Sequence, residues 1–290
     1  SSSVDFTWSN LSDAQKAALG NSSAVLDYLR GVRTGESSEG GLFRNRNQLI
    51  GDIVHSSPVF VGTPDNFGYE RFSWSGASTY QDYRGLRASR TPMLYVNAND
   101  GMTHAFNANT GAEVFAYVPS SALAQMKTLT QTNYSHQFIN DGAITVADVF
   151  DSSGSVGNWR SLLVSSTGRG GRQLYALDVT DPTVPTSGAA AARVKWEFSH
   201  SDLGRFTGKP VVARMNNGVW AVIVGNGYNS DQYKGFLFVI NALTGELIST
   251  IDTGACPTTD SPCVSNGLAE VTTWDDDDDG DVDYVYAGDL

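Results

Sequence analysis

One pattern of strands and turns recurs along the chain, and this repetition constrains the fold more than any other feature of the sequence. In each copy an apolar strand leads through a glycine-bearing turn to a second strand, and a polar turn then leads to a third. Short polar residues and glycine in such turns are typical of tight hairpins. The copies occupy residues 92–119, 160–182 with 194–198, 218–250, and a stretch that begins at Leu268.

Repeated antiparallel units of this kind predict the blades of a β-propeller, because one unit cannot bury both of its faces whereas stacked units can. We therefore expect an all-β chain of antiparallel blades, similar to the blades of PQQ-binding and WD-type propellers. A β-sandwich with similar hairpins is the alternative. Counted from His55, the pattern gives four blades and part of a fifth. The propeller is therefore expected to be incomplete, and the chain to be a fragment of a longer protein.

Residues 1–50 differ from the rest and predict a helical lead-in followed by a loop, with the blades over residues 51–290. Ser12 and Gln15 fit a capping box, in which each side chain accepts a hydrogen bond from the backbone of the other at the start of a helix. A second short helix is expected over residues 23–29.

The overall charge excludes one broad class of partner. The formal net charge is −12, whereas binding to nucleic acid requires a basic surface. The sequence has no run of 18 or more apolar residues, so we expect no membrane-spanning segment. The N-terminus does not have the basic and apolar regions of a signal peptide, so any export signal is expected to precede this fragment.

Two cysteines, Cys256 and Cys263, lie close together in a proline-containing stretch. Two cysteines without a nearby histidine are too few for a zinc site. We expect a disulfide that closes a small loop, which would indicate an oxidising compartment. A pair of unpaired thiols is the alternative.

Negative charge is concentrated in the stretch 275–283, which we call the aspartate loop. Its first, third, fifth and ninth positions are aspartates and its sixth is Gly280. This is the register of an EF-hand calcium loop, in which alternate carboxylates converge, glycine permits the bend, and the seventh residue offers its backbone carbonyl. The predicted Ca²⁺ ligands are the side chains of Asp275, Asp277, Asp279 and Asp283 and the carbonyl of Asp281.

The aspartate loop differs from an EF-hand at its twelfth position, which is Tyr286 in place of the bidentate glutamate, and its flanks have the pattern of strands. We therefore expect a strand–loop–strand relative of the EF-hand, with a dissociation constant of roughly 10⁻⁶ to 10⁻³ M. The side chains of Asp276, Asp278 and Asp281 are expected to face solvent. A solvated acidic turn without metal is the alternative, and magnesium is disfavoured because it requires a rigid octahedral site.

The remaining candidate residues are assigned structural roles. The four histidines do not occur at metal-binding spacing, and the sequence outside the aspartate loop contains no carboxylate pair to which acid–base catalysis can be assigned. The Gly-Arg-Gly-Gly stretch 168–171 could cradle a phosphate, but a turn between two strands is the expected role. Residues 225–230 are expected to form a long loop, and Trp196 and Trp220 to lie in the core.

Several long motifs resemble the C-terminal propeller of the PilY1/PilC family. They are GDIVHSSPVFVG, YVNANDGMTHAFNANTGAEVFAYVP, RGGRQLYALDVTDP, GNGYNSDQYKGFLFVINALTG and DGDVDYVYAGDL, in this order between residues 51 and 290. The resemblance implies an exported protein of Gram-negative bacteria, associated with the outer membrane, the cell surface or the type IV pilus. It implies a non-enzymatic role in pilus assembly, in control of extension and retraction, and in adhesion.

The partners implied by the resemblance are pilins or minor pilins and a host-cell or abiotic surface. The family's calcium loop maps onto the same aspartates of the aspartate loop.

Two other functions are compatible with the sequence pattern. A quinoprotein-like dehydrogenase propeller would use calcium beside a quinone, but Cys256 and Cys263 are not adjacent as in such enzymes, and the aspartate loop leaves no ligand position for a cofactor. A generic calcium-binding scaffold propeller of the cell envelope would repeat the aspartate loop in several blades, whereas here it occurs once.

Overall fold

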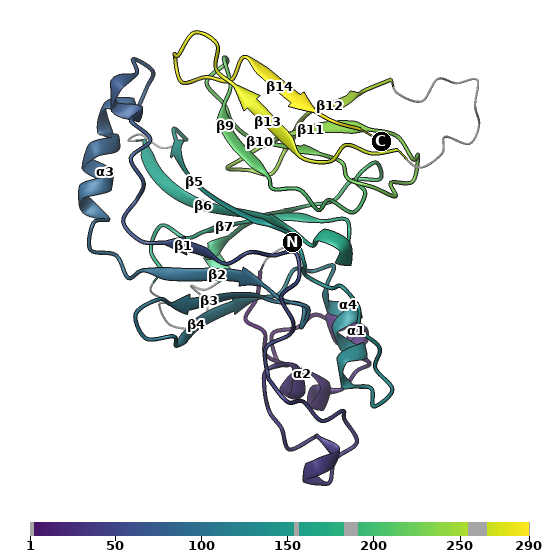
Figure 1. Ribbon diagram of the computed structural model, residues 1–290. Helices are drawn as coiled ribbons and strands as arrows, with labels where there is room; N and C mark the ends of the chain where they lie inside the picture. Colours follow the sequence, from purple (N-terminus) through teal and green to yellow (C-terminus); the bar gives the residue numbers. More distant parts are fainter. Residues whose placement is uncertain (1–2, 154–156, 183–190, 255–265, 290) are drawn as a thin grey trace.

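The computed structural model describes residues 3–153, 157–182, 191–254 and 266–289, which are built mostly from antiparallel sheets. Three sheets have four strands each and a fourth has two, and every sheet follows the order of the chain. In Figure 1 the sheets succeed one another from the blue sheet at the lower left to the yellow pair at the top, and they do not close into a ring. The predicted all-β fold of successive antiparallel units is confirmed.

The strands group into three blades and a partial fourth. The first blade contains β1 (Val59–Val61), β2 (Met93–Asn97), β3 (Thr103–Asn107) and β4 (Glu113–Tyr117). The second contains β5 (Ile144–Asp151), β6 (Asn158–Ser166), β7 (Leu174–Asp178) and β8 (Val194–Phe198). The third contains β9 (Val211–Arg214), β10 (Trp220–Gly225), β11 (Phe236–Asn241) and β12 (Leu247–Asp252), and the partial blade contains β13 (Val271–Trp274) and β14 (Tyr284–Ala287).

The helices are short and lie outside the sheets. The α-helices are α1 (Asp13–Ala18), α2 (Ser23–Leu29), α3 (Tyr80–Leu86) and α4 (Leu123–Met126). The 3₁₀ turns are η1 (Ser37–Glu39), η2 (Tyr69–Arg71), η3 (Ala77–Thr79), η4 (Lys127–Thr130), η5 (Gly168–Gly170) and η6 (Ala191–Arg193).

The predicted count of four blades and part of a fifth was wrong. The stretch after His55 does not begin a blade of its own, because β1 pairs with β2 in the first sheet. Each complete blade also has a leading strand, β1, β5 or β9, that the three-strand pattern did not include. The turns before these strands are long and variable in sequence, so the repeat becomes recognisable only from the second strand of each blade.

The hairpins between the last two strands of a blade form as the sequence predicts. In the turn before β4, the Asn107 side chain accepts hydrogen bonds from the N–H groups of Asn109 and Thr110, at 2.9 and 3.3 Å. Asn241 does the same in the turn before β12. Each turn ends in a glycine with positive φ, Gly111 at 73° and Gly245 at 74°, a conformation that costs other residues about 1–2 kcal/mol.

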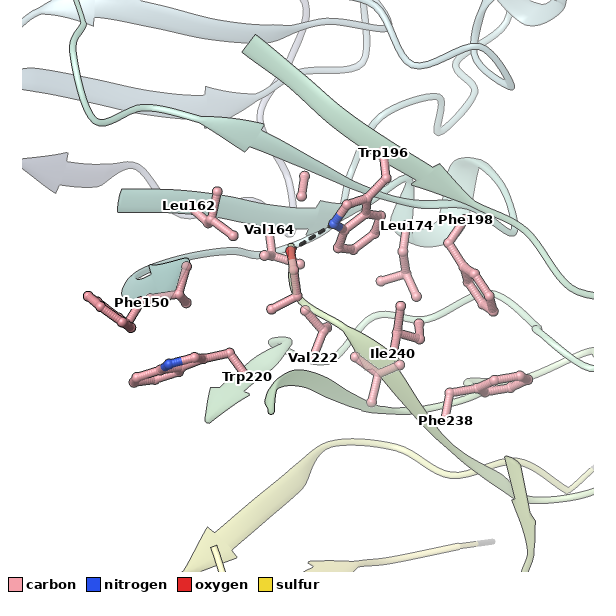
Figure 2. Packing of buried hydrophobic residues seen from close by; sticks show 14 of the residues in the cluster. Phe150, Leu162, Val164, Leu174, Trp196, Phe198, Trp220, Val222, Phe238 and Ile240 are labelled. Atoms are coloured by element: carbon pink, nitrogen blue, oxygen red, sulfur yellow. Dashed lines mark hydrogen bonds between the residues drawn. The ribbon is translucent and has the colours of Figure 1, made fainter. Parts of the chain in front are cut away.

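The largest apolar cluster lies between the second and third blades. Figure 2 shows Leu162, Val164 and Leu174 facing Val222, Phe238 and Ile240 of the neighbouring blade. Trp196 lies in the same layer, and its indole N–H donates to the carbonyl of Ala242 at 2.8 Å. Trp196 and Trp220 are 6% and 5% exposed, which confirms that both are core residues. Full burial of each large apolar side chain contributes about 1.5–3 kcal/mol.

The two N-terminal helices form as predicted and pack on the connection between the first and second blades. Ser12 and Gln15 make the reciprocal bonds of the capping box at the start of α1. Leu26 of α2 shares an apolar cluster with Met126 of α4 and with Met102 from the β2–β3 turn. The lead-in therefore covers the end of the first blade where its β2–β3 turn lies (Figure 1).

The matched glycines of the two hairpins allow the packing of Trp196 to be tested. A Cβ added to Gly245 would lie 2.5 Å from the Trp196 ring, whereas a Cβ on Gly111 would meet nothing within 4 Å. Both alanine variants are expected to lose about 1–2 kcal/mol of folding stability, because alanine disfavours the left-handed backbone. Gly245→Ala is expected to lose about 1–3 kcal/mol more, because the added methyl group overpacks the site. Urea unfolding should show the larger loss for Gly245→Ala. Equal losses would show that the Trp196 ring yields without cost.

Candidate metal centre

The aspartate loop is the turn that connects β13 to β14, and its backbone is held by its own carboxylates. The Asp275 side chain accepts hydrogen bonds from the N–H groups of Asp279 and Gly280, at 3.2 and 2.8 Å. The Asp283 side chain accepts from the N–H of Asp276 at 2.8 Å. Gly280 has a φ of 88°, so the sixth position makes the bend for which glycine was predicted.

Three of the predicted ligand side chains converge. One carboxylate oxygen each of Asp275, Asp277 and Asp283 lie within 4.8 Å of one another. Partial desolvation, together with the negative charges of Asp279, Asp283 and Asp275, raises the pKa of Asp277 above its usual value. Hydrogen bonds from Asp276 and Asn216 instead hold the pKa of Asp283 low. The donor set consists of hard, anionic oxygens whose mutual repulsion a cation would relieve, and it fits Ca²⁺.

The side chains of Asp279 and Asp281 do not belong to this group of three. The Asp279 carboxylate accepts a hydrogen bond from the N–H of Asp281 at 2.8 Å. The Asp281 carboxylate is buried and pairs with Arg214, with one oxygen 2.6 Å from the guanidinium. The expectation that the Asp281 side chain faces solvent was therefore wrong, because a basic residue 67 positions earlier, at the end of β9, lies against it. A ligand role for the Asp281 carbonyl stays a prediction.

Asp276 and Asp278 are exposed, as predicted. Asp276 accepts from the Trp274 indole at 3.1 Å, and Asp278 pairs with Arg71 at 3.0 Å. Asp278 also adopts a positive φ of 58°, and its side chain is not part of the three converging carboxylates. Its ion pair with Arg71 is exposed on both sides and contributes little energy.

The aspartate loop rests on the connection between β1 and β2, residues 62–92. A Cβ on Gly280 would lie 2.6 Å from the Phe72 ring, so only glycine allows this close approach. The Arg214 guanidinium, which pairs with Asp281, also lies over the Trp74 ring at 4.6 Å from its centre. In Figure 1 the yellow turn and the blue connection that carries α3 lie at the same end of the sheets.

The contacts with Phe72, Trp74 and Arg214 were not predicted. Nothing in the local sequence links residues 71–74 to a loop about 200 positions later. The only indication is the density of aromatic rings in residues 67–74, which is unusual for a surface connection.

The other residues that the sequence singled out are the two cysteines, the four histidines and the glycine-rich stretch 168–171. Cys256 and Cys263, the predicted disulfide, lie outside the described residues. Each of the four histidines is within 3.6 Å of a carboxylate, and no two of them share the same one. The stretch 168–171 forms the turn between β6 and β7, as expected.

His104 is the most perturbed of the histidines. It is buried on β3, and its two ring nitrogens contact Glu113 at 2.5 Å and Asp100 at 3.0 Å. Burial lowers its pKa, but the hydrogen bonds and charges of Asp100 and Glu113 outweigh burial and raise the pKa to about 9. His104 is therefore a buried imidazolium that ties the β2–β3 turn to β4.

Comparisons with known proteins were consistent with one another. The family model of the PilY1 beta-propeller domain matches residues 50–290. A type IV pilus biogenesis factor PilY1 homolog of Xylella fastidiosa (strain Temecula1) is 42% identical over 289 residues, which cover 99% of this chain and 22% of that relative. The type IV pilus biogenesis factor PilY1 of Pseudomonas aeruginosa (strain PAK) is 37% identical over 303 residues, which cover 99% of this chain and 24% of that relative.

A solved structure supports the same fold. The crystal structure of the Pseudomonas aeruginosa PilY1 C-terminal domain is similar with a TM-score of 0.60 and 37% identity, over 73% of this chain and 39% of that one. The predicted family resemblance and the predicted incomplete propeller are thereby confirmed. The chain spans about a quarter of the length of the curated relatives. Among the helices of the described ranges, none is long and apolar enough to cross a membrane.

The raised pKa of His104 predicts a pH-dependent stability. Its folded pKa of about 9 exceeds the unfolded value of 6.5, so its contribution is complete below pH 6.5 and is lost as the pH rises through 9. We expect His104→Gln to cost on the order of 2–3 kcal/mol at pH 6, after allowance for the half-exposed Glu113. This difference from the wild type should shrink by pH 10. Urea unfolding at pH 6, 8 and 10 measures it, and a difference independent of pH would contradict the assignment.

Proposed function

The chain belongs to the family of the PilY1 β-propeller domain, and from this premise we propose that it is the propeller of a non-enzymatic type IV pilus biogenesis factor that binds one Ca²⁺. The convergence of Asp275, Asp277 and Asp283 is the observation that carries the calcium proposal. The family membership, together with the naming of the relatives as type IV pilus biogenesis factors, carries the pilus proposal.

The choice of Ca²⁺ follows from the ligands that the aspartate loop offers. Calcium accepts about six to eight hard oxygen ligands in a flexible geometry. The three converging carboxylates, together with Asp279, the Asp281 carbonyl and water, would supply them. Magnesium prefers a rigid octahedron and keeps most of its waters.

Bound calcium would act on the contacts of the aspartate loop with the β1–β2 connection. The ion replaces repulsion among Asp275, Asp277 and Asp283 with attraction to a common centre, so the loaded turn is stiffer. The Phe72 ring lies against Gly280 of that turn, and the Trp74 ring lies against Arg214, which pairs with Asp281. We propose that calcium in this way stabilises one arrangement of the surface formed by the β1–β2 connection.

The rest of the proposal concerns the whole protein. We propose that it is exported to the Gram-negative cell surface, where it contacts pilins or minor pilins and a host-cell or abiotic surface. In this proposal the calcium-bound propeller regulates pilus extension and retraction, and so twitching motility and adhesion.

Calcium binding is tested with a matched pair of substitutions in one loop. Asp283→Asn removes a converging charge, whereas Asp278→Asn removes an exposed charge and keeps a residue that tolerates positive φ. Calorimetric titration should show a fall in Ca²⁺ affinity of at least about tenfold for Asp283→Asn and little change for Asp278→Asn. At a hundredfold excess of Ca²⁺ over Kd the wild type should gain about 2.7 kcal/mol of stability. No heat with the wild type at millimolar Ca²⁺ would contradict the metal site.

The role in the pilus is tested in the bacterium that carries the full-length protein. Deletion of the gene should remove surface pili, which tests the biogenesis role by itself. Asp283→Asn should alter the number of surface pili or the twitching distance, because the calcium-stabilised state is lost, whereas Asp278→Asn should behave as the wild type. If both variants twitch and assemble pili normally while Asp283→Asn has lost calcium in vitro, the regulatory part of the proposal is wrong.

A further inference from the structure

A cavity of about 410 Å³ lies at the end of the sheets opposite the aspartate loop. Thr207 precedes β9 and lines this cavity, whereas Arg214 ends β9 beside the aspartate loop. The two sites therefore lie at opposite ends of one strand. The cavity is lined by residues from the connections before β5 and β9 and from the β6–β7 and β10–β11 loops, namely Phe138, Arg169, Arg205, Thr207, Tyr228 and Asn229.

The loops around the cavity are bonded to one another through their backbones. The N–H of Arg205 donates to the carbonyl of Tyr228 at 2.7 Å, and the N–H of Tyr228 donates back at 3.3 Å. The Arg205 guanidinium donates to the Arg169 carbonyl. A Cβ on Gly204 or Gly227 would collide with the backbone of the facing loop, so glycine permits this close contact. The walls of the cavity are therefore held in place before any ligand arrives.

The cavity is positively charged in a chain that is strongly acidic. Of the six lining residues in the described ranges two are arginines and none is an acid, although the whole chain carries a net charge of −12. Within the described part of the chain Arg169 has no carboxylate partner, and its guanidinium lies over the Phe138 ring at 5.5 Å from the centre. In the same ranges the Arg205 side chain bonds only a carbonyl. Among the described residues neither charge is therefore neutralised by a neighbouring carboxylate, and an anion would do so.

The available donors favour a carboxylate over a phosphate. Phosphate sites are commonly built from several free backbone N–H groups, but here the N–H groups of Arg205, Gly227 and Tyr228 are already bonded to carbonyls. The remaining donors are the planar guanidinium groups of two arginines, which pair with a carboxylate as well as with a phosphate, so the lack of free N–H groups is what favours the carboxylate. In the described ranges the side chains of Thr207 and Asn229 make no hydrogen bond, so they are available for hydroxyl groups of a ligand.

We propose that this cavity binds an acidic sugar, a ring that carries one carboxylate and several hydroxyl groups. The carboxylate pairs with Arg169 and Arg205, and the apolar face of the ring lies against Tyr228 or Phe138. Thr207 and Asn229 bind the hydroxyl groups. The size of the cavity is within the usual range of roughly 300–1,000 Å³ for small-ligand sites.

The test uses D-glucuronate as the probe, with D-glucose and inorganic phosphate as comparisons. Calorimetry and saturation-transfer NMR on this chain should show that glucuronate binds more tightly than either comparison, and that a calcium chelator leaves its binding unchanged. Arg169→Gln and Arg205→Lys should each weaken glucuronate binding, the former by about tenfold. Arg30→Gln is the matched control, because Arg30 is exposed and its side chain has no described hydrogen bond or ion pair.

Three results would overturn the proposal. The first is glucuronate binding that equals glucose binding, since the charge would then contribute nothing. The second is phosphate binding as tight as or tighter than glucuronate binding, which would show a general anion site. The third is unchanged affinity in Arg169→Gln. Because the Arg169 guanidinium makes no hydrogen bond within the described residues, this variant should fold, and its unfolding curve checks that it does.

Discussion

The packing of one blade face against the next determines where every loop of this protein lies. The second and third blades share a continuous apolar layer that includes Leu162, Val164, Val222 and Phe238. Since neither sheet can leave that layer exposed, the strands of both blades run side by side, and their connections collect at two opposite ends. The aspartate loop and the arginine-lined cavity owe their surroundings to this arrangement, because each contains residues that only stacked blades bring together.

The two ends of the blades differ in charge. At one end Asp275, Asp277 and Asp283 converge, and at the other Arg169 and Arg205 line a cavity free of acidic side chains. The separation by the length of a strand prevents these opposite charges from neutralising each other directly. An acidic site for a cation and a basic site for an anion can thus coexist on one small fold, each with its own unpaired charge available to a ligand.

The sequence predicts features whose causes are local. Hairpins with Asn107 and Asn241, the capping box of Ser12 and the bend at Gly280 depend on side chains that bond backbone a few positions away, so each follows from its own short motif. The leading strands β5 and β9 were missed because long connections without a regular turn precede them. Contacts such as Arg214 with Asp281 join residues 67 positions apart and become evident only once the blades are stacked. The cavity likewise draws on four separate segments.

The pair of Arg214 and Asp281 anchors one side of the aspartate loop. A buried carboxylate without a partner would cost several kcal/mol, so Asp281 has to stay with Arg214 whether or not a cation is present. Arg214 is held in turn against Trp74, which fixes one side of the aspartate loop to the β1–β2 connection. The converging carboxylates of Asp275, Asp277 and Asp283 are on the free side, and Asp277 and Asp283 there are exposed. In the calcium-binding proposal the ion acts on this free side, and the contacts of Asp281 with Arg214 and of Arg214 with Trp74 connect the aspartate loop to the β1–β2 connection.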